Sequence, residues 1–141
     1  MPYRANYPAT VAEVLVDGKK YKDDTLRALK AFRRIKPWRG SDEEKRVKFV
    51  NLNAALAGIY DIAEPKLVFV PSSGSSYYCP HSNELVMVGK WSVVTFLHEF
   101  GHARGFDERR TCRWSINLFR RIFPKSFARC EQVGHMLLKP S

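Results

Sequence analysis

The segment His98-Glu99-Phe100-Gly101-His102 has the residue types and the spacing that can bind a metal ion. Two histidines four residues apart project from the same face of a helix, so both imidazoles can reach one ion at about 2 Å from each ring nitrogen. Glu99 is one residue further round the helix, where its carboxylate can take a proton from a metal-activated water without binding the metal. The alternative is a helix with incidental polar residues, but polar groups on a buried helix need partners. The spacing therefore predicts a zinc site with Glu99 as general base.

A third zinc ligand is expected close by in the sequence, because catalytic zinc usually takes three protein ligands and leaves one position open. Gly105 and Glu108 follow the second histidine in the pattern HExxHxxGxxE. Gly105 can let the backbone reverse, so that Glu108, in the first turn of the next helix, returns over the two histidines. Asp107 is the nearest competitor, and its other role is to cap that helix. Glu108 also has another role open to it, as a carboxylate that interacts with the helix dipole.

With this glycine and acid, the HExxH motif resembles that of the zincin metallopeptidases and, more loosely, that of the ImmA/IrrE group of small intracellular zincins. In that group a helix pair and a small sheet precede HExxH, and a later helix supplies glutamate in a pattern like ExxANxFA. The string that starts at Glu108 is similar in register, with Thr111, Cys112 and Trp114 at the Ala, Asn and Phe positions. The resemblance covers roughly Leu67 to Pro124, and only HExxH in it is specific.

The resemblance implies a zinc-dependent metalloendopeptidase that hydrolyses peptide bonds of a protein substrate. The ion lowers the pKa of its water, and Glu99 takes that proton and later hands it to the leaving amine. The same ligands would also support a metallohydrolase that acts on a different bond. An extended substrate could pair with the strand expected at 84–88. Candidates for a further donor to the developing negative charge are Tyr77, Tyr78, His81 and His135.

The segments before the motif predict two helices and a small sheet. One helix is expected from Asp24 to the residues before Pro37, and Ser41 with Glu44 forms a capping box for a second helix, whose apolar stripe runs from Val47 to Ile59. Expected strands are 66–70, 77–79 and 84–88, of which the last two are joined by a turn and antiparallel. A short N-terminal hairpin is expected around 11–18, because Asp17-Gly18 is typical of a two-residue turn.

The motif itself falls in a mostly buried helix expected over 91–103, which Gly105 ends. Asp107 caps the next helix, which runs to Phe123, and a final stretch, 127–138, is expected to be helical. Together these elements predict an α+β fold, a minimal zincin-like domain with helices packed on a small, mostly antiparallel sheet. The chain has 141 residues and 45% apolar residues, which predicts a single domain over 1–141.

Composition also limits the compartment and the partners. No stretch of the sequence approaches eighteen consecutive apolar residues, and the N-terminus lacks the pattern of a secretory signal, so we expect a cytoplasmic protein with no membrane contact. The cysteines Cys79, Cys112 and Cys130 are odd in number and contain no CxxC pair, which favours reduced thiols. Cys79 and His81 could form a second metal pair with one of the others, but we expect buried apolar cysteines instead. His135 is expected to be a packed or surface histidine, and the sequence leaves the oligomeric state open.

The net charge of +10 supports a second hypothesis of a different class. The charge is concentrated at the two ends of the chain, since residues 49–104 are nearly neutral. The pairs Arg33-Arg34, Arg109-Arg110 and Arg120-Arg121 could contact phosphates, although solvated helix faces have the same composition. The alternative function is therefore a basic nucleic-acid-associated regulatory protein with a structural or inactive zinc site, whose binding would be nonspecific.

Overall fold

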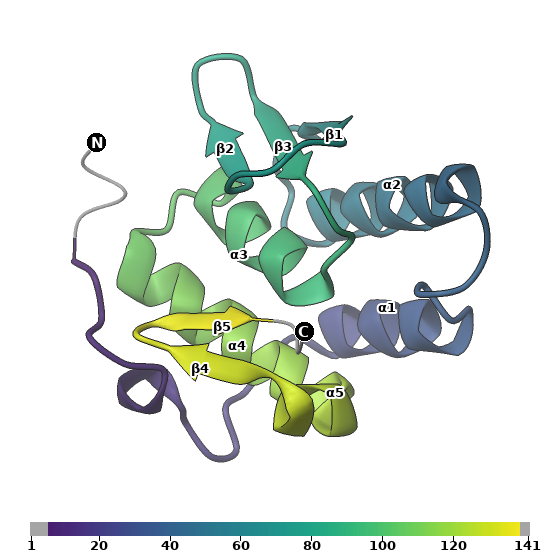
Figure 1. The fold of residues 1–141 in the computed structure, drawn as a ribbon. Coiled ribbons are helices and arrows are strands. Elements are labelled where there is room, and N and C mark those ends of the chain that lie inside the picture. The colour runs from purple at the N-terminus through teal and green to yellow at the C-terminus, as the bar shows by residue number, and fades with distance from the viewer. Residues whose placement is uncertain (1–5, 139–141) are drawn as a thin grey trace. The chain divides into compact units, whose positions relative to one another are not determined.

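The computed structural model describes residues 6–138, and the chain divides into two compact units. Residues 21–91 form one unit, here called the sheet unit. Of the described residues, 6–20 and 92–138 form the other, here called the split unit (Figure 1). The elements confirm a mixed α+β composition, whereas the single domain expected over 1–141 stays a prediction.

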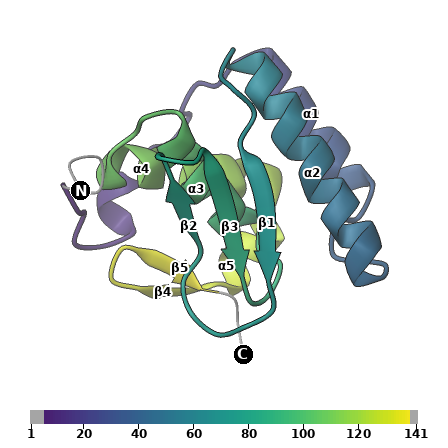
Figure 2. The ribbon, with the colours of Figure 1, turned by 90° about the horizontal axis from the view of Figure 1, so that it is seen from above.

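Two helices and a three-stranded sheet make up the sheet unit. Helices α1 (Asp23–Arg34) and α2 (Asp42–Ile59) lie side by side (Figure 2). The predicted capping box at the start of α2 is confirmed, because Ser41 Oγ accepts from the Glu44 amide while the Glu44 carboxylate accepts from the Ser41 amide. The expected apolar stripe is only partly right, since Val47 and Val50 are exposed.

The sheet has the order β1-β3-β2, with β1 at Lys66–Val70, β2 at Tyr77–Cys79 and β3 at Glu84–Val88. β2 and β3 are antiparallel as predicted, but β1 pairs with β3 in parallel, so the expectation of a mostly antiparallel sheet is wrong here. The thirteen residues between β1 and β3, numbers 71–83, are long enough for the crossover that parallel strands need. The segment 71–76 leaves room for β3 between β1 and β2 (Figure 2).

The aromatic core of the sheet unit connects its helices to its strands. The Phe32 and Phe49 rings meet edge-on at 5.2 Å between centroids, and Phe49 stacks on Trp91 at 5.8 Å. The Trp91 ring also lies 4.3 Å from that of Phe69 in β1. These contacts hold α2 against the β1 edge of the sheet and α1 against α2.

The split unit contains the helices α3 (Val93–Ala103), α4 (Glu108–Ile122) and α5 (Pro124–Arg129). Near its N-terminus lies a 3-10 turn, η2 (Ala12–Val14), in place of the hairpin predicted over 11–18. Val11 and Val14 are both buried, which is the three-residue period of a 3-10 turn and not the alternation of a strand. Asn117 of α4 fixes this segment, since its side chain accepts from the Val16 amide and donates to the Val14 carbonyl, each at 2.8 Å.

A second correction concerns the C-terminal stretch, for which a helix over 127–138 was expected. α5 ends at Arg129, and an antiparallel hairpin follows, with β4 at Glu131–Val133 and β5 at Met136–Leu138 (Figure 1). Gly134 has a φ of +58°, which suits the two-residue turn between paired Val133 and Met136 and interrupts a helix. In β5 only Leu137 is buried while its neighbours are exposed, as strand alternation requires.

Candidate metal centre

Helix α3 presents His98 and His102 on one face. Ser92 caps the helix by accepting from the Thr95 amide, and the buried residues that follow hold the helix in the interior. The two imidazole rings lie 5.1 Å apart between centroids. The side chain of His102 is fully buried and that of His98 is 14% exposed, so the pair is open to solvent on the His98 side.

A tight reversal after α3 leads to α4, as the sequence predicted. Gly105 has a φ of +90°, and the next amide, that of Phe106, donates back to the Gly101 carbonyl at 3.1 Å. Asp107 Oδ1 accepts from the Arg110 amide at 2.8 Å, so Asp107 is the N-cap of α4. Glu108 is therefore the first residue of α4, on the side of the reversal that faces the histidines.

The Glu108 carboxylate lies against both histidines. Its Oε1 is 2.9 Å from His102 Nε2 and 3.3 Å from His98 Nε2, and its Oε2 is 3.1 Å from His98 Nε2. Burial by itself opposes ionisation of Glu108, but the hydrogen bonds from His102 and His98 outweigh it, and the pKa of Glu108 is lowered well below its ordinary value. The structure thus brings together all three residues expected as ligands.

Helices α3 and α4 can pack closely together because Gly101 has no side chain. A Cβ atom at Gly101 would lie 1.9 Å from Thr111 Oγ1 and 2.8 Å from Thr111 Cβ. The Thr111 hydroxyl donates to the His98 carbonyl at 2.5 Å, which ties α4 to the helix turn that carries the first histidine. Neither role was expected from the sequence, although glycine inside a helix is a signal of close packing.

Cys112 is the one cysteine of the described residues that reaches this cluster. Ligand atoms of His98, Glu108 and Cys112 lie within 4.8 Å of one another, so this group could hold a metal ion. The Cys112 Sγ is 3.8 Å from Nδ1 of His98, whereas the Nε2 of that ring contacts Glu108. The pKa of the Cys112 thiol is raised to about 12, mainly by burial and further by the charges of Glu108 and Glu99. Glu99 itself is buried on α3, close enough for its charge to act on this thiol.

His135, in the hairpin turn, also reaches Glu108. Its Nε2 lies 3.1 Å from Glu108 Oε2, and its side chain is 23% exposed. The sequence offered His135 as one of four donor candidates but favoured a packed or surface histidine. The other three candidates, Tyr77, Tyr78 and His81, belong to the sheet unit, where the Tyr78 hydroxyl donates to Asn83.

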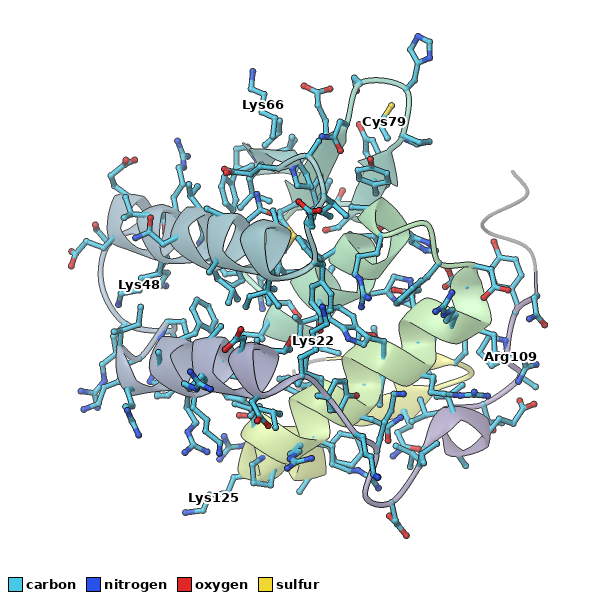
Figure 3. The ribbon with its side chains drawn as sticks, turned by 180° about the vertical axis from the view of Figure 1, so that it is seen from behind. Lys22, Lys48, Lys66, Cys79, Arg109 and Lys125 are labelled. Carbon is cyan, nitrogen blue, oxygen red and sulfur yellow. The ribbon has the colours of Figure 1, made fainter. Side chains whose placement is uncertain are left out.

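The other cysteines do not join a metal cluster within residues 6–138. Cys79 is half-buried at the end of β2 (Figure 3), and Cys130 is half-buried between α5 and β4. Of the cysteines expected to be buried, only Cys112 is so. No group of three ligands includes Cys79 or His81 in this part of the chain.

Comparisons with known proteins do not assign the chain to a family. No family model, curated protein or solved structure matches it. Over residues 6–138 no helix has both the length and the apolar character that crossing a bilayer requires. What the chain does must therefore be argued from the geometry of the cluster around Glu108.

Proposed function

We propose that the protein is a zinc-dependent metalloendopeptidase with a minimal zincin-like fold, in which His98, His102 and Glu108 hold the zinc ion. The observation that carries the proposal is the meeting of two imidazoles from one helix with a carboxylate from the start of the next. Two nitrogens and one carboxylate oxygen are a ligand set of catalytic zinc sites, which keep a further position open.

The hydrogen bonding of His102 supports a cation at this place. The Nδ1 of His102 lies 2.8 Å from the Phe106 carbonyl, which can only accept, so Nδ1 carries the proton. With Nδ1 protonated, the contact of Nε2 with Glu108 Oε1 at 2.9 Å needs a positive charge between the two atoms, which is either a second proton on the ring or a metal ion. A zinc ion would suit this place, because two ligand atoms on one tetrahedral zinc ion are about 3.3 Å apart. A histidine whose second nitrogen donates to a carbonyl is also typical of metal sites.

His102 suits the third ligand position better than Cys112 does, because the Cys112 sulfur carries a proton. A thiol binds zinc as thiolate, and the raised pKa of Cys112 disfavours that form in the metal-free protein. Its sulfur instead contacts the nitrogen of His98 that does not face Glu108, where it can orient the ring. Cobalt substitution separates the two sets, because a thiolate ligand adds near-ultraviolet charge-transfer absorption to bound Co²⁺ and a set without Cys112 does not.

Glu99 is the proposed general base. When bound, zinc would polarise the peptide carbonyl and acidify a water molecule. Glu99 would accept the proton of the attacking water and pass it to the leaving amine. Its burial on α3 next to the cluster keeps this carboxylate away from bulk solvent.

The test is Glu99→Gln, which keeps the size of the side chain and removes the base. We expect zinc content equal to that of the wild type and loss of proteolysis of a proteome extract, with chelator abolishing cleavage by the wild type. Glu64→Gln, at an exposed carboxylate of the sheet unit, is the matched control and should remain active. Cleavage retained in Glu99→Gln would reject the proposal, and so would a wild type that binds zinc but cleaves no protein.

The second candidate is a basic nucleic-acid-associated regulatory protein with a structural zinc site, and a group of three neighbouring cations favours it. Three other arginines that the sequence offered for phosphate contact are already bound within the protein, because Arg109, Arg120 and Arg121 contact backbone or side-chain groups of residues 6–19. Arg110 and Arg113 have no ion pair to a carboxylate within residues 6–138. The pKa of Lys19 is lowered by partial burial and by the charges of these two arginines, so the three cations are neighbours.

Such a cluster predicts binding to the phosphate backbone that weakens steeply with salt. Arg110→Gln with Arg113→Gln should weaken binding of a duplex oligonucleotide and reduce the slope of log K against log salt by about 0.9 for each phosphate that is no longer neutralised. The control replaces two exposed arginines of the sheet unit, Arg27 and Arg46, by glutamine. Equal binding by both double variants would reject this contact surface. Proteolysis without nucleic acid would reject the purely regulatory function.

A further inference from the structure

The hairpin β4–β5 places a third histidine against the proposed zinc ligand Glu108. The pairing of Val133 with Met136 leaves Gly134 and His135 as the two turn residues. From this turn the imidazole Nε2 reaches Glu108 Oε2 at 3.1 Å, although the two residues are 27 positions apart in sequence. Among the described residues, the other ring contact of His135 is with Tyr7. His135 therefore touches the carboxylate and neither of the histidines of α3.

The turn is held in place from both sides. The Val11 amide donates to the Gly134 carbonyl at 3.0 Å. The Tyr7 ring meets the His135 ring edge-on, with 5.5 Å between centroids and 70° between planes. Arg109 of α4 in turn donates to the Tyr7 carbonyl at 3.4 Å. The segment before η2, the hairpin and the start of α4 thus form one connected set of contacts within the split unit.

We propose that His135 is a positioning residue of the metal centre, which donates from Nε2 to Glu108 Oε2 and thereby presents Oε1 to the metal. The carboxylate has two oxygens and three histidine neighbours, and only Oε1 contacts His102. A donor on Oε2 from outside α3 further restrains the rotation of the carboxylate about its last bond. Loss of an outer hydrogen bond of this kind typically lowers metal affinity 10- to 100-fold.

The inference rests on the proposed metal centre, and its test therefore reads metal affinity in the full chain, by competition of Zn²⁺ with a chromophoric chelator. Two amide variants form a matched pair. His135→Gln keeps a donor at the distance of Nε2, whereas His135→Asn is too short to reach Oε2 but suits a hairpin turn. We expect His135→Asn to bind Zn²⁺ about 10- to 100-fold more weakly than the wild type, and His135→Gln to recover most of that loss.

Met136→Ala, at an exposed neighbour in the same hairpin, controls for damage to the hairpin and should bind Zn²⁺ as the wild type does. The positioning role is overturned if His135→Asn binds Zn²⁺ like the wild type, if His135→Gln is as weak as His135→Asn, or if Met136→Ala is equally weak. Failure of the two proposals is distinguishable. A wild type that binds no Zn²⁺ removes the metal centre itself, whereas a wild type that binds Zn²⁺ without cleaving protein removes the peptidase function and leaves the affinity series interpretable.

Discussion

Gly101→Ala tests whether the close approach of α3 and α4 is what forms the metal centre. The added Cβ would lie 1.9 Å from Thr111 Oγ1, and ordinary contact begins at 3.4 Å, so the atoms must separate by 1.5 Å. Rotation of the Thr111 side chain cannot remove the strain, because its Cβ would still be 2.8 Å away and its Cα 3.3 Å. The helix backbone of α4 must therefore shift.

The expected loss of stability follows from two opposed effects. Overpacking in a core costs typically 1–3 kcal/mol, and a clash that reaches from the Thr111 hydroxyl to its Cβ and backbone places this variant at the upper end, about 3 kcal/mol. Alanine gains up to about 1 kcal/mol over glycine within a helix. The net loss is about 2 kcal/mol, which for a chain of this length lowers Tm by about 7 °C.

Urea unfolding of the metal-free protein, followed by circular dichroism, measures this loss, and zinc titration of the same variant measures its effect on the site. Because Thr111 is one helix turn from Glu108, we also expect zinc affinity to fall at least about tenfold. Gly58→Ala is the matched control: it lies in α2, no atom comes within 4 Å of its added Cβ, and it should be neutral or slightly stabilising.

A second substitution gives the sharpest check of this reasoning. Thr111→Gly alone removes a hydrogen bond and weakens α4, so it should destabilise the wild type. In the Gly101→Ala background the same change removes the clashing atoms and should increase stability. A Gly101→Ala variant within about 0.5 kcal/mol of the wild type, or equal destabilisation of both backgrounds by Thr111→Gly, would contradict the close packing of α3 on α4.

Four further predictions concern Asp107, Asn117 and the cysteines. Asp107→Ala should cost about 1 kcal/mol of stability and leave zinc affinity intact, because Asp107 is the cap of α4. Glu108→Gln should abolish tight zinc binding. If zinc titrations show the opposite pattern, Asp107 is the ligand and Glu108 is not. The hydrogen bond from the Arg110 amide lowers the pKa of Asp107. The contribution of Asp107 to stability is therefore complete above the ordinary pKa of 3.8 and is lost as the pH falls toward the lowered pKa. The urea midpoints of the wild type and Asp107→Ala should accordingly converge at low pH. Asn117→Ala removes two hydrogen bonds to the segment around η2 and should lower stability by about 2 kcal/mol, which unfolding by urea would contradict if the midpoint did not move. Finally, Cys79 should react with iodoacetamide in the folded protein well before Cys112. The pKa of Cys79 is lowered chiefly by its hydrogen bond with Ser82, whereas Cys112 is buried and its pKa is raised. If mass spectrometry finds the reverse order of alkylation, the packing described for α4 is contradicted.

The parts of the site that the sequence predicted are those fixed by local geometry. His98 and His102 share a face because a helix has 3.6 residues per turn. Gly105 and Asp107 then define a reversal and a cap that need only their immediate neighbours, and both are confirmed. Glu108 follows directly from the cap, so a stretch of eleven residues contains the information that brings the three proposed ligands together.

The errors lie where long-range contacts decide the structure. Whether 127–138 forms a helix or a hairpin depends on a turn that is anchored by the Val11 amide, more than 120 residues earlier in the chain. In the same way, the parallel pairing of β1 with β3 depends on which strand occupies the central place in the sheet, and hydrophobic alternation within each strand does not contain that information. The sequence nevertheless contained a signal for the hairpin, because Gly134 lies between two strand-like segments of three residues, 131–133 and 136–138.

The position of His135 explains why a comparison by sequence register could not predict how the carboxylate is oriented. In the register of the ImmA/IrrE-like pattern an amide is expected at Cys112, one helix turn after Glu108. The structure has a thiol there that contacts His98, and the side chain that reaches the outer oxygen of Glu108 comes from the hairpin turn. In the proposed role of His135, the hydrogen bond that orients Glu108 comes from the hairpin and not from α4. A pattern of fixed spacing cannot find such a residue, whereas the contact distance of 3.1 Å does.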